Sequence, residues 1–313
     1  MKEILKFKNL LFLSIFILLS SCGQTIDVDD EREYITFSNP YSKGPRVLSY
    51  KGLPFNGELV KYFDDEKTQL KERRDYKEGK IDGKVEEYNK NGQLEKSVTY
   101  KEGIKNGISE EYDLKTVEVG FDSDEEVYIT EEIPYLEIKQ YYKDGKLNGP
   151  YVNYYDNEDI YKKVTYINGK KEGFEEKFWS SGDLMSKVNY INGNREGSYL
   201  EYHSNDSIKI KTNYKNDVFH GSYKKYYDNG QLKEKCEYIN NFKFGRIEYY
   251  FENGQIHKIV HCNIENRRNY DGPYEEYYEN GQLKIKTNYK VGYKKGVYEE
   301  YNENGKLIKK TWN

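Results

Sequence analysis

A glycine recurs along most of the chain at a nearly constant spacing. Twenty-four residues separate Gly149 from Gly173, and the same interval separates Gly197 from Gly221. A fixed short period is the signature of a repeat architecture, in which each unit packs on its neighbours instead of on a closed globular core. The glycines that open the units are Gly57, Gly83, Gly107, Gly149, Gly173, Gly197, Gly221, Gly245, Gly272 and Gly296.

Each unit has the pattern of a β-hairpin, as the stretch Gly272–Gly296 shows. A tyrosine-rich run ends at Asn280-Gly281, a pair that favours a two-residue type I′ turn because both of its residues take positive φ. In the run Leu283–Tyr289, apolar or weakly polar residues alternate with strongly polar ones, which predicts a strand with one buried and one solvated face. The turn residues predicted in this way are Asn229, Gly230, Asn253, Gly254, Asn280 and Gly281.

Tyrosine is unusually frequent, with 35 copies, and it occupies fixed positions in the unit. When the opening glycine is counted as zero, the fifth residue is almost always Tyr, and the second is often Tyr or aliphatic. A regular strand places positions two and five on opposite faces, whereas a bulge or a strong twist between them places both on one face. Because tyrosine offers amphipathic contact area, we predict a binding row formed by Tyr154, Tyr202, Tyr226, Tyr250, Tyr277 and Tyr301.

These patterns together predict an all-β fold, namely an elongated repeat ribbon of stacked antiparallel β-hairpins in a single-layer twisted sheet. The repeats cover residues 51–313 in about ten units. A β-propeller is the rival architecture, but each of its blades needs about 40–45 residues. One unit carries an acidic insertion within residues 113–136, which we expect to form a loop on a binding face.

Composition and spacing argue against several classes of chemistry. The 50 basic and 54 acidic residues are interspersed, with no basic run that would mark a nucleic-acid site. Adjacent glutamates such as Glu275 and Glu276 point to opposite faces of a strand and cannot share a proton. Cys236 and Cys262 fall on strands two ladder steps apart, so we favour two buried thiols, with a disulfide as the alternative. We predict no catalytic residue, no metal, no cofactor and no small-molecule substrate.

The first 21 residues have the order of a bacterial lipoprotein signal peptide. A basic start precedes an apolar run of about 10 residues, which is too short to span a bilayer as a helix. The following segment Leu19–Cys22 resembles a lipobox, which implies cleavage before Cys22 and lipidation of its thiol. The alternative is an ordinary secretory signal with a chance cysteine. The lipobox implies a lipid anchor in the cell envelope, in the outer membrane if the host has two membranes. We expect residues 22–50 to form an acidic tether and an entry segment that includes an entry strand.

The consensus of the unit resembles a known bacterial repeat. Gly221–Gly245 and Gly272–Gly296 carry paired tyrosines, Asn-Gly and a later tyrosine in the register of the variant MORN repeat. Proteins built of it resemble the YwqK-type antitoxin-like family, and this resemblance implies no active site. We therefore predict a non-enzymatic, membrane-anchored binding or scaffold lipoprotein with a protein partner. The alternatives are an antitoxin or immunity protein that neutralises an exported toxin, and a structural cell-envelope protein that binds lipid or the cell wall.

Overall fold

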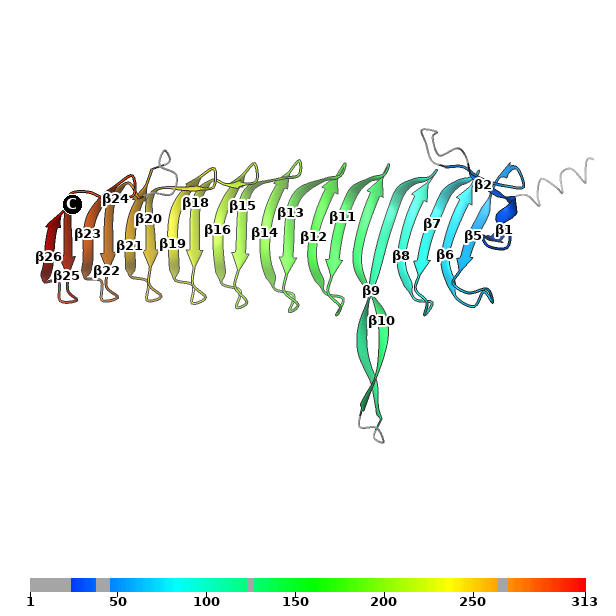
Figure 1. Cartoon of the computed structure of the whole chain (residues 1–313), viewed down its shortest axis with the longest axis horizontal. Coiled ribbons are helices and arrows are strands. Elements are labelled where there is room, and N and C mark those ends of the chain that lie inside the picture. The colour runs from blue at the N-terminus through cyan, green and yellow to red at the C-terminus, as the bar shows by residue number, and fades with distance from the viewer. Residues whose placement is uncertain (1–23, 38–45, 123–126, 264–269) are drawn as a thin grey trace, which may run out of the picture. The chain divides into compact units, whose positions relative to one another are not determined.

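The structure is a computed structural model that describes residues 24–37, 46–122, 127–263 and 270–313. β-Strands make up nearly all of the regular structure in these residues, and one short 3-10 helix, Arg32–Tyr34, accompanies them. The chain divides into two compact structural units, each made of several repeats. Unit 1 is Met1–Asp159 with Tyr166–Gly169, and unit 2 is Ile160–Thr165 with Lys170–Asn313. The strands of the hairpin repeats pair antiparallel, so the predicted all-β class of antiparallel hairpin repeats is confirmed (Figure 1). Cys22 and the predicted signal peptide lie outside the described residues.

The strands follow one another along each unit. In unit 1 they are β1 (Gln24–Asp27), β2 (Ile35–Phe37), β3 (Leu48–Tyr50), β4 (Leu53–Pro54), β5 (Gly57–Tyr62), β6 (Leu70–Lys77), β7 (Lys80–Tyr88), β8 (Leu94–Lys101), β9 (Ile104–Asp122), β10 (Val127–Lys143) and β11 (Lys146–Tyr154). β12 (Ile160–Ile167) contains residues of both units. In unit 2 they are β13 (Lys170–Phe178), β14 (Leu184–Ile191), β15 (Asn194–Tyr202), β16 (Ile208–Lys215), β17 (Val218–Phe219), β18 (Gly221–Tyr226), β19 (Leu232–Ile239), β20 (Phe242–Tyr250), β21 (Ile256–Cys262), β22 (Gly272–Tyr277), β23 (Leu283–Lys290), β24 (Tyr293–Lys294), β25 (Val297–Tyr301) and β26 (Leu307–Trp312).

The N-terminal segment, predicted to be an acidic tether and entry segment, forms the strand β1 at Gln24–Asp27. This strand pairs in parallel with β5, and Ile26 lies opposite Leu59. Ile26 and Val28 alternate with aspartates and give this part of the predicted tether and entry segment one apolar face. Ile26, which is 3% exposed, packs in a core cluster with Leu48, Phe55, Leu59 and Tyr76.

A β-bulge near the turn is shared by the hairpins. Between β18 and β19, Lys225 pairs with Glu234 and Tyr226 pairs with Leu232, which leaves Lys233 as an extra residue on the second strand. The same one-residue shift in register occurs between β7 and β8, β15 and β16, β22 and β23, and β25 and β26. Because the extra residue sits on the second strand, the first strand keeps its alternation, and positions two and five lie on opposite faces.

The Asn-Gly turns are not the two-residue type I′ turns that the sequence predicts. In the pair Asn229-Gly230 only the glycine has a positive φ, of 81°. Gly230 N–H donates to the Tyr227 carbonyl at 3.0 Å and Tyr227 N–H donates to the Gln231 carbonyl at 2.9 Å, which closes a three-residue loop. The asparagine side chain explains the difference, because its Oδ1 accepts the N–H of Gln231 at 2.9 Å. The same turn forms at Asn253-Gly254 and Asn280-Gly281.

Two-residue type I′ turns join the hairpins at their opposite ends. Asn192 and Gly193 have φ values of 53° and 91°, and Ile191 pairs with Asn194 across them. Most hairpins therefore have one end that carries a three-residue loop, or between β5 and β6 a longer loop, and one end that carries a type I′ turn. We call the first of these the Asn-Gly edge.

In each repeat, position two of the first strand and alternate residues of the second strand share one face of the sheet. We call this face the packed face. Thr212 and Thr287 are each 2% exposed and lie opposite Tyr199 and Tyr274. The predicted burial of one face of the second strand is therefore confirmed for this row. The core cluster of unit 2 is Tyr223, Cys236, Ile247, Val260 and Cys262.

The acidic insertion is a β-ribbon and not the loop that we expected. β10 stays paired with β9 from Leu136 to Val127, and Figure 1 shows the ribbon projecting from the sheet of unit 1. Alternating β-branched residues in both arms explain this, because they favour a strand over a loop. A neighbouring turn holds the ribbon, since Gln93 Nε2 donates to the Glu132 carbonyl at 2.6 Å.

Candidate functional site

The position-five rings form a row in which no member is fully buried. All of them are half-buried, whereas Leu59, Val85, Tyr223 and Ile247 at position two are buried. We call the face that carries positions three and five the tyrosine face. Its row is Tyr62, Tyr88, Tyr112 and Tyr154 in unit 1, and Phe178, Tyr202, Tyr226, Tyr250, Tyr277 and Tyr301 in unit 2. The predicted binding residues thus include one tyrosine of unit 1 and five of unit 2.

Tyrosine–glutamate pairs show directly that the two tyrosine positions face opposite ways. On β22 the Tyr277 hydroxyl donates to Glu275 at 2.8 Å, and the Tyr274 hydroxyl donates to Glu276 at 2.8 Å. Each pair joins residues two apart on a strand, which share a face, so the adjacent carboxylates point to opposite faces as predicted.

The pairing between positions five and three recurs along the tyrosine face. The Tyr250 hydroxyl donates to Glu248 at 2.8 Å and the Tyr301 hydroxyl donates to Glu299 at 3.0 Å. Burial, followed by the hydrogen bond to the carboxylate, raises the pKa of Tyr250 to about 12, and the same causes raise the pKa of Tyr277 to about 12. These hydroxyls therefore stay protonated at neutral pH and hold their rings in fixed orientations.

Basic side chains complete the tyrosine face. Arg246 Nε lies 2.8 Å from Glu248, and Lys310 Nζ lies 2.8 Å from Glu299. Lys286 Nζ lies 3.7 Å from Glu275. The face therefore presents aromatic rings between carboxylates and cations, so it can pack against apolar groups and exchange hydrogen bonds with charges of either sign.

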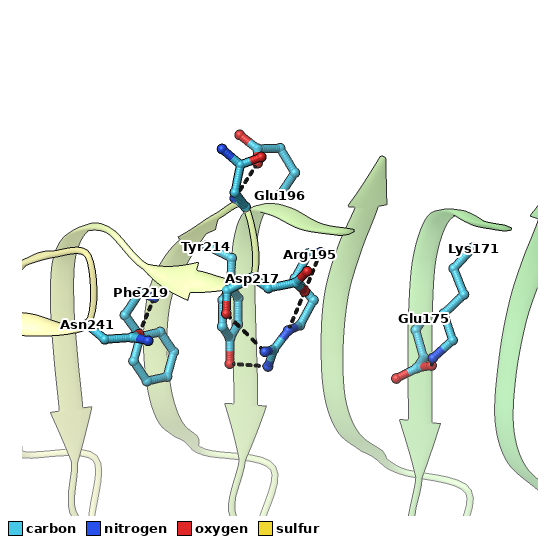
Figure 2. Close-up of polar contacts among 9 residues, drawn as sticks. Lys171, Glu175, Arg195, Glu196, Tyr214, Asp217, Phe219 and Asn241 are labelled. Atoms are coloured by element: carbon cyan, nitrogen blue, oxygen red, sulfur yellow. Dashed lines mark hydrogen bonds and ion pairs between the residues drawn. The ribbon is translucent and has the colours of Figure 1, made fainter. Parts of the chain in front are cut away.

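On the packed face, charged side chains cover aromatic rings, as Arg195 of β15 and Tyr214 of β16 show. Figure 2 shows Arg195 beside Tyr214 and Asp217. The Arg195 guanidinium lies 4.2 Å from the Tyr214 ring centroid, donates to its hydroxyl at 2.9 Å and pairs with Asp217 at 3.1 Å. Hydrogen bonds from the Arg195 backbone and side chain hold the pKa of Asp217 below its ordinary value. The chain thus covers much of this face with its own groups.

Position six holds a set of functional side chains that the sequence reasoning missed. The Tyr227 hydroxyl donates to the Tyr250 carbonyl at 2.9 Å, and the Tyr278 hydroxyl donates to the Tyr301 carbonyl at 2.9 Å. His203 Nε2 lies 3.2 Å from the Tyr226 carbonyl. A ring at position six therefore links one repeat to position five of the next repeat. The tyrosine doublets in the sequence could have indicated these position-six residues.

The predicted turn asparagines also link successive repeats. Asn229 Nδ2 donates to the Glu252 carbonyl at 3.0 Å, and Asn280 Nδ2 donates to the Glu303 carbonyl at 2.9 Å. Asn253 Nδ2 makes the equivalent bond to Glu279 at 3.2 Å. These residues therefore shape their own turn and also hold the next one.

The cysteines and histidines do not converge on a reactive centre in the described ranges. Cys236 and Cys262 are free and buried, as favoured from the sequence, and burial raises the pKa of the Cys236 thiol to about 12. No group of three or more His, Cys, Asp and Glu residues within the described ranges is placed to hold a metal ion. The same ranges contain no helix long and apolar enough to cross a membrane.

Comparison with known proteins matches the hairpins to a repeat family. The MORN repeat variant family matches residues 81–102, 195–216, 219–240, 270–290 and 294–311. These five segments are similar to the repeats of that family. Each matched segment carries one member of the tyrosine row, namely Tyr88, Tyr202, Tyr226, Tyr277 and Tyr301. No curated protein matches the chain significantly.

One solved structure that aligns with this chain is "Crystal Structure of TcdB2-TccC3-Cdc42". It aligns with 90% of this chain at 10% sequence identity and a TM-score of 0.12. The aligned part is 21% of the other chain, so this chain spans about a fifth of that chain's length. A score of this size carries no argument about fold or function.

Proposed function

We propose that the chain is a non-enzymatic scaffold that binds a protein partner through its tyrosine face. The observation that carries the proposal is the row of half-buried position-five rings, which carboxylates hold in place on the face opposite the packed one. MORN repeats generally take part in protein or membrane binding, which supports a binding role. Lipidation of Cys22 and tethering of the scaffold to the cell envelope are part of the same proposal.

The geometry favours a protein over a lipid or nucleic-acid ligand. Rings already fixed by hydrogen bonds lose little conformational freedom on binding, and tyrosine is enriched at the centre of protein interfaces. Anionic lipids and nucleic acids need a concentration of basic residues, whereas Arg246, Lys286 and Lys310 each face a carboxylate. The partner therefore has a surface of mixed charge with apolar groups between the charges.

The other two roles predicted from the sequence remain narrower proposals. An exported toxin is one protein that would fit the tyrosine face, which makes the antitoxin or immunity role a special case of the scaffold. A structural role on lipid or the cell wall requires that the same face adsorb to a surface instead of a folded protein. Binding assays with purified cell wall and with anionic vesicles separate that role from the scaffold.

Two matched double variants test the proposal. Tyr277→Ser with Tyr301→Ser removes two rings from the tyrosine face, and Tyr274→Ser with Tyr298→Ser removes two rings from the packed face of the same strands, β22 and β25. The partner is first captured from the producing cells, and its affinity is then measured with purified components. We expect the first variant to bind at least about 30-fold more weakly, which is about 2 kcal/mol.

The packed-face variant is the control for indirect loss of structure. It should unfold at a lower temperature and bind within about 3-fold of the parent chain. Circular dichroism of both variants confirms that the sheet is present. Equal loss of affinity in the two variants would contradict the proposal.

A further inference from the structure

Two hollows of the molecule are built from equivalent positions of two different repeats. The one in unit 1 has a volume of about 570 Å³ and is lined by Phe63, Lys71 and Tyr88 among others. The one in unit 2 has a volume of about 460 Å³ and is lined by Phe251, His257 and Tyr277 among others. In each, a position-six Phe, the bulge residue after it and position five of the next repeat meet at the Asn-Gly edge.

The phenylalanines explain why hollows form at these two places. At Tyr227 and Tyr278 the position-six hydroxyl reaches the position-five carbonyl of the next repeat and joins the two repeats. Phe63 and Phe251 have no hydroxyl, so they cannot make this bond to Tyr88 or Tyr277. The edge keeps its spacing there, because Asn253 still donates to the Glu279 carbonyl at 3.2 Å. A space with a backbone acceptor in its wall is left between the rings.

The groups around the hollows favour a cation with an apolar or planar body. Lys71 lies 5.2 Å from the Phe63 ring centroid, and His257 stacks on Phe251 at 4.4 Å, so each phenylalanine already takes a flat or cationic neighbour. In unit 2, burial lowers the pKa of His257, which keeps its ring neutral.

Carboxylates give the hollow of unit 2 an excess of negative charge, whereas in unit 1 Arg74 pairs with Glu72 at 2.5 Å and the other lining charges balance. In unit 2, Lys284 is ion-paired with Glu276 at 2.9 Å, and Glu279 and Glu303 add two carboxylates to the rim. In unit 1 the lining holds three carboxylates and two ammonium groups, namely Glu72, Glu87, Glu95, Lys71 and Lys90.

We infer that each hollow is a binding site for an arginine side chain of a protein partner. A guanidinium is planar, stacks on an aromatic face and donates several N–H bonds in a fixed fork. It can therefore lie along the phenylalanine ring, donate to the Tyr88 or Tyr277 carbonyl in place of the missing tyrosine hydroxyl, and pair with a rim carboxylate. These sites lie at the Asn-Gly edge, and Tyr88 and Tyr277 belong both to their lining and to the tyrosine row.

The test uses N-acetyl-arginine amide as the probe and the full chain in ligand-observed NMR titrations. We expect two equivalent sites per chain with a dissociation constant of about 1 mM, the range for a fragment of this size. Phe251→Tyr supplies the missing hydroxyl and closes the hollow of unit 2, so one site should remain. Phe63→Tyr with Phe251→Tyr should leave none, while the melting temperature stays the same or rises.

Matched controls make the outcome decisive. Tyr227→Phe removes a hydroxyl that now bridges two repeats and should add a third site for the probe. N-acetyl-lysine amide and N-acetyl-tyrosine amide should each bind at least about 5-fold more weakly, because neither combines a planar body with a positive charge. The inference is overturned if N-acetyl-arginine amide does not bind, or if its binding survives both Tyr substitutions. It is also overturned if N-acetyl-tyrosine amide binds equally well.

The result is independent of the proposed function. Tyr226→Ser with Tyr301→Ser removes two rings of the tyrosine face that line neither hollow, and should leave probe binding unchanged. Loss of partner binding in that variant with no probe binding in the parent chain would retain the tyrosine face and reject the arginine sites.

Discussion

Tyr274 and Tyr277 show how one residue type serves two purposes on a single strand. Both donate to a carboxylate two residues away at 2.8 Å. Tyr274 also packs against Tyr270 and Tyr289, with ring centroids 5.9 Å and 5.5 Å away, so it belongs to the interior of the packed face. Tyr277 shares its face with Glu275 and the nearby Lys286, where a partner can reach it.

The raised pKa of Tyr277 gives the first prediction. Its pKa rises from 10.0 to about 12, so the folded state favours the neutral hydroxyl. The stability that this provides is complete below pH 10 and is lost as the pH rises toward 12. After allowance for solvent screening we expect the loss to be about 1 kcal/mol.

Urea unfolding between pH 9 and pH 11 measures this effect. The parent chain should lose stability more steeply than Tyr277→Phe, because phenylalanine cannot ionise. Identical pH dependence of the two chains would mean that folding does not raise the pKa of Tyr277.

The turn is the element that joins neighbouring repeats. Asn229 uses its Oδ1 to shape its own loop and its Nδ2 to hold the carbonyl of Glu252 in the next loop. Asn280 does the same with Glu303. Sequence alone indicated a turn at these residues, but the contact with the next repeat depends on how the strands stack.

Two substitutions at Asn229 separate its two roles. Asn229→Asp keeps the acceptor for Gln231 and loses the donor for Glu252, and should lower the free energy of unfolding by about 1 kcal/mol. Asn229→Ala loses both bonds and should cost about 2 kcal/mol. Chemical denaturation of the two variants measures the difference, and equal costs would show that the bond to Glu252 contributes nothing.

A turn glycine and an opening glycine differ in what an added side chain would meet. At Gly230, with φ of 81°, an added Cβ has nothing within 4 Å, so Gly230→Ala should cost about 1 kcal/mol from backbone strain alone. At Gly57 the Cβ would lie 1.9 Å from the Gln24 carbonyl oxygen. Gly57→Ala should therefore cost more and release β1 from β5. Hydrogen exchange of the Ile26 amide checks this, and retained protection in Gly57→Ala would contradict it.

At the scale of the whole molecule, the sequence could predict the features that recur in every repeat and those that follow the alternation of residues along a strand. The glycine period, the hairpins and the buried row ending at Tyr289 follow from spacing alone. The extra residue Lys233 depends on the register between two strands, and no local sequence pattern indicates it. Because it lies on the second strand, the first strand keeps its alternation, and positions two and five face opposite ways. The pairing of β1 with β5 joins Gln24 to Gly57, a contact between distant residues that spacing within a repeat does not report. The hollows beside Phe63 and Phe251 depend on one absent oxygen atom in each repeat.

The central claim is that position five faces a partner and position two faces the packed interior. Site-specific photocrosslinking in the producing cells tests it most directly, with p-benzoylphenylalanine placed at Tyr277 in one chain and at Tyr274 in another. The claim predicts a discrete crosslinked protein from position 277 and none from position 274. A crosslink from position 274 alone, equal crosslinks from both positions, or none from position 277 would contradict it.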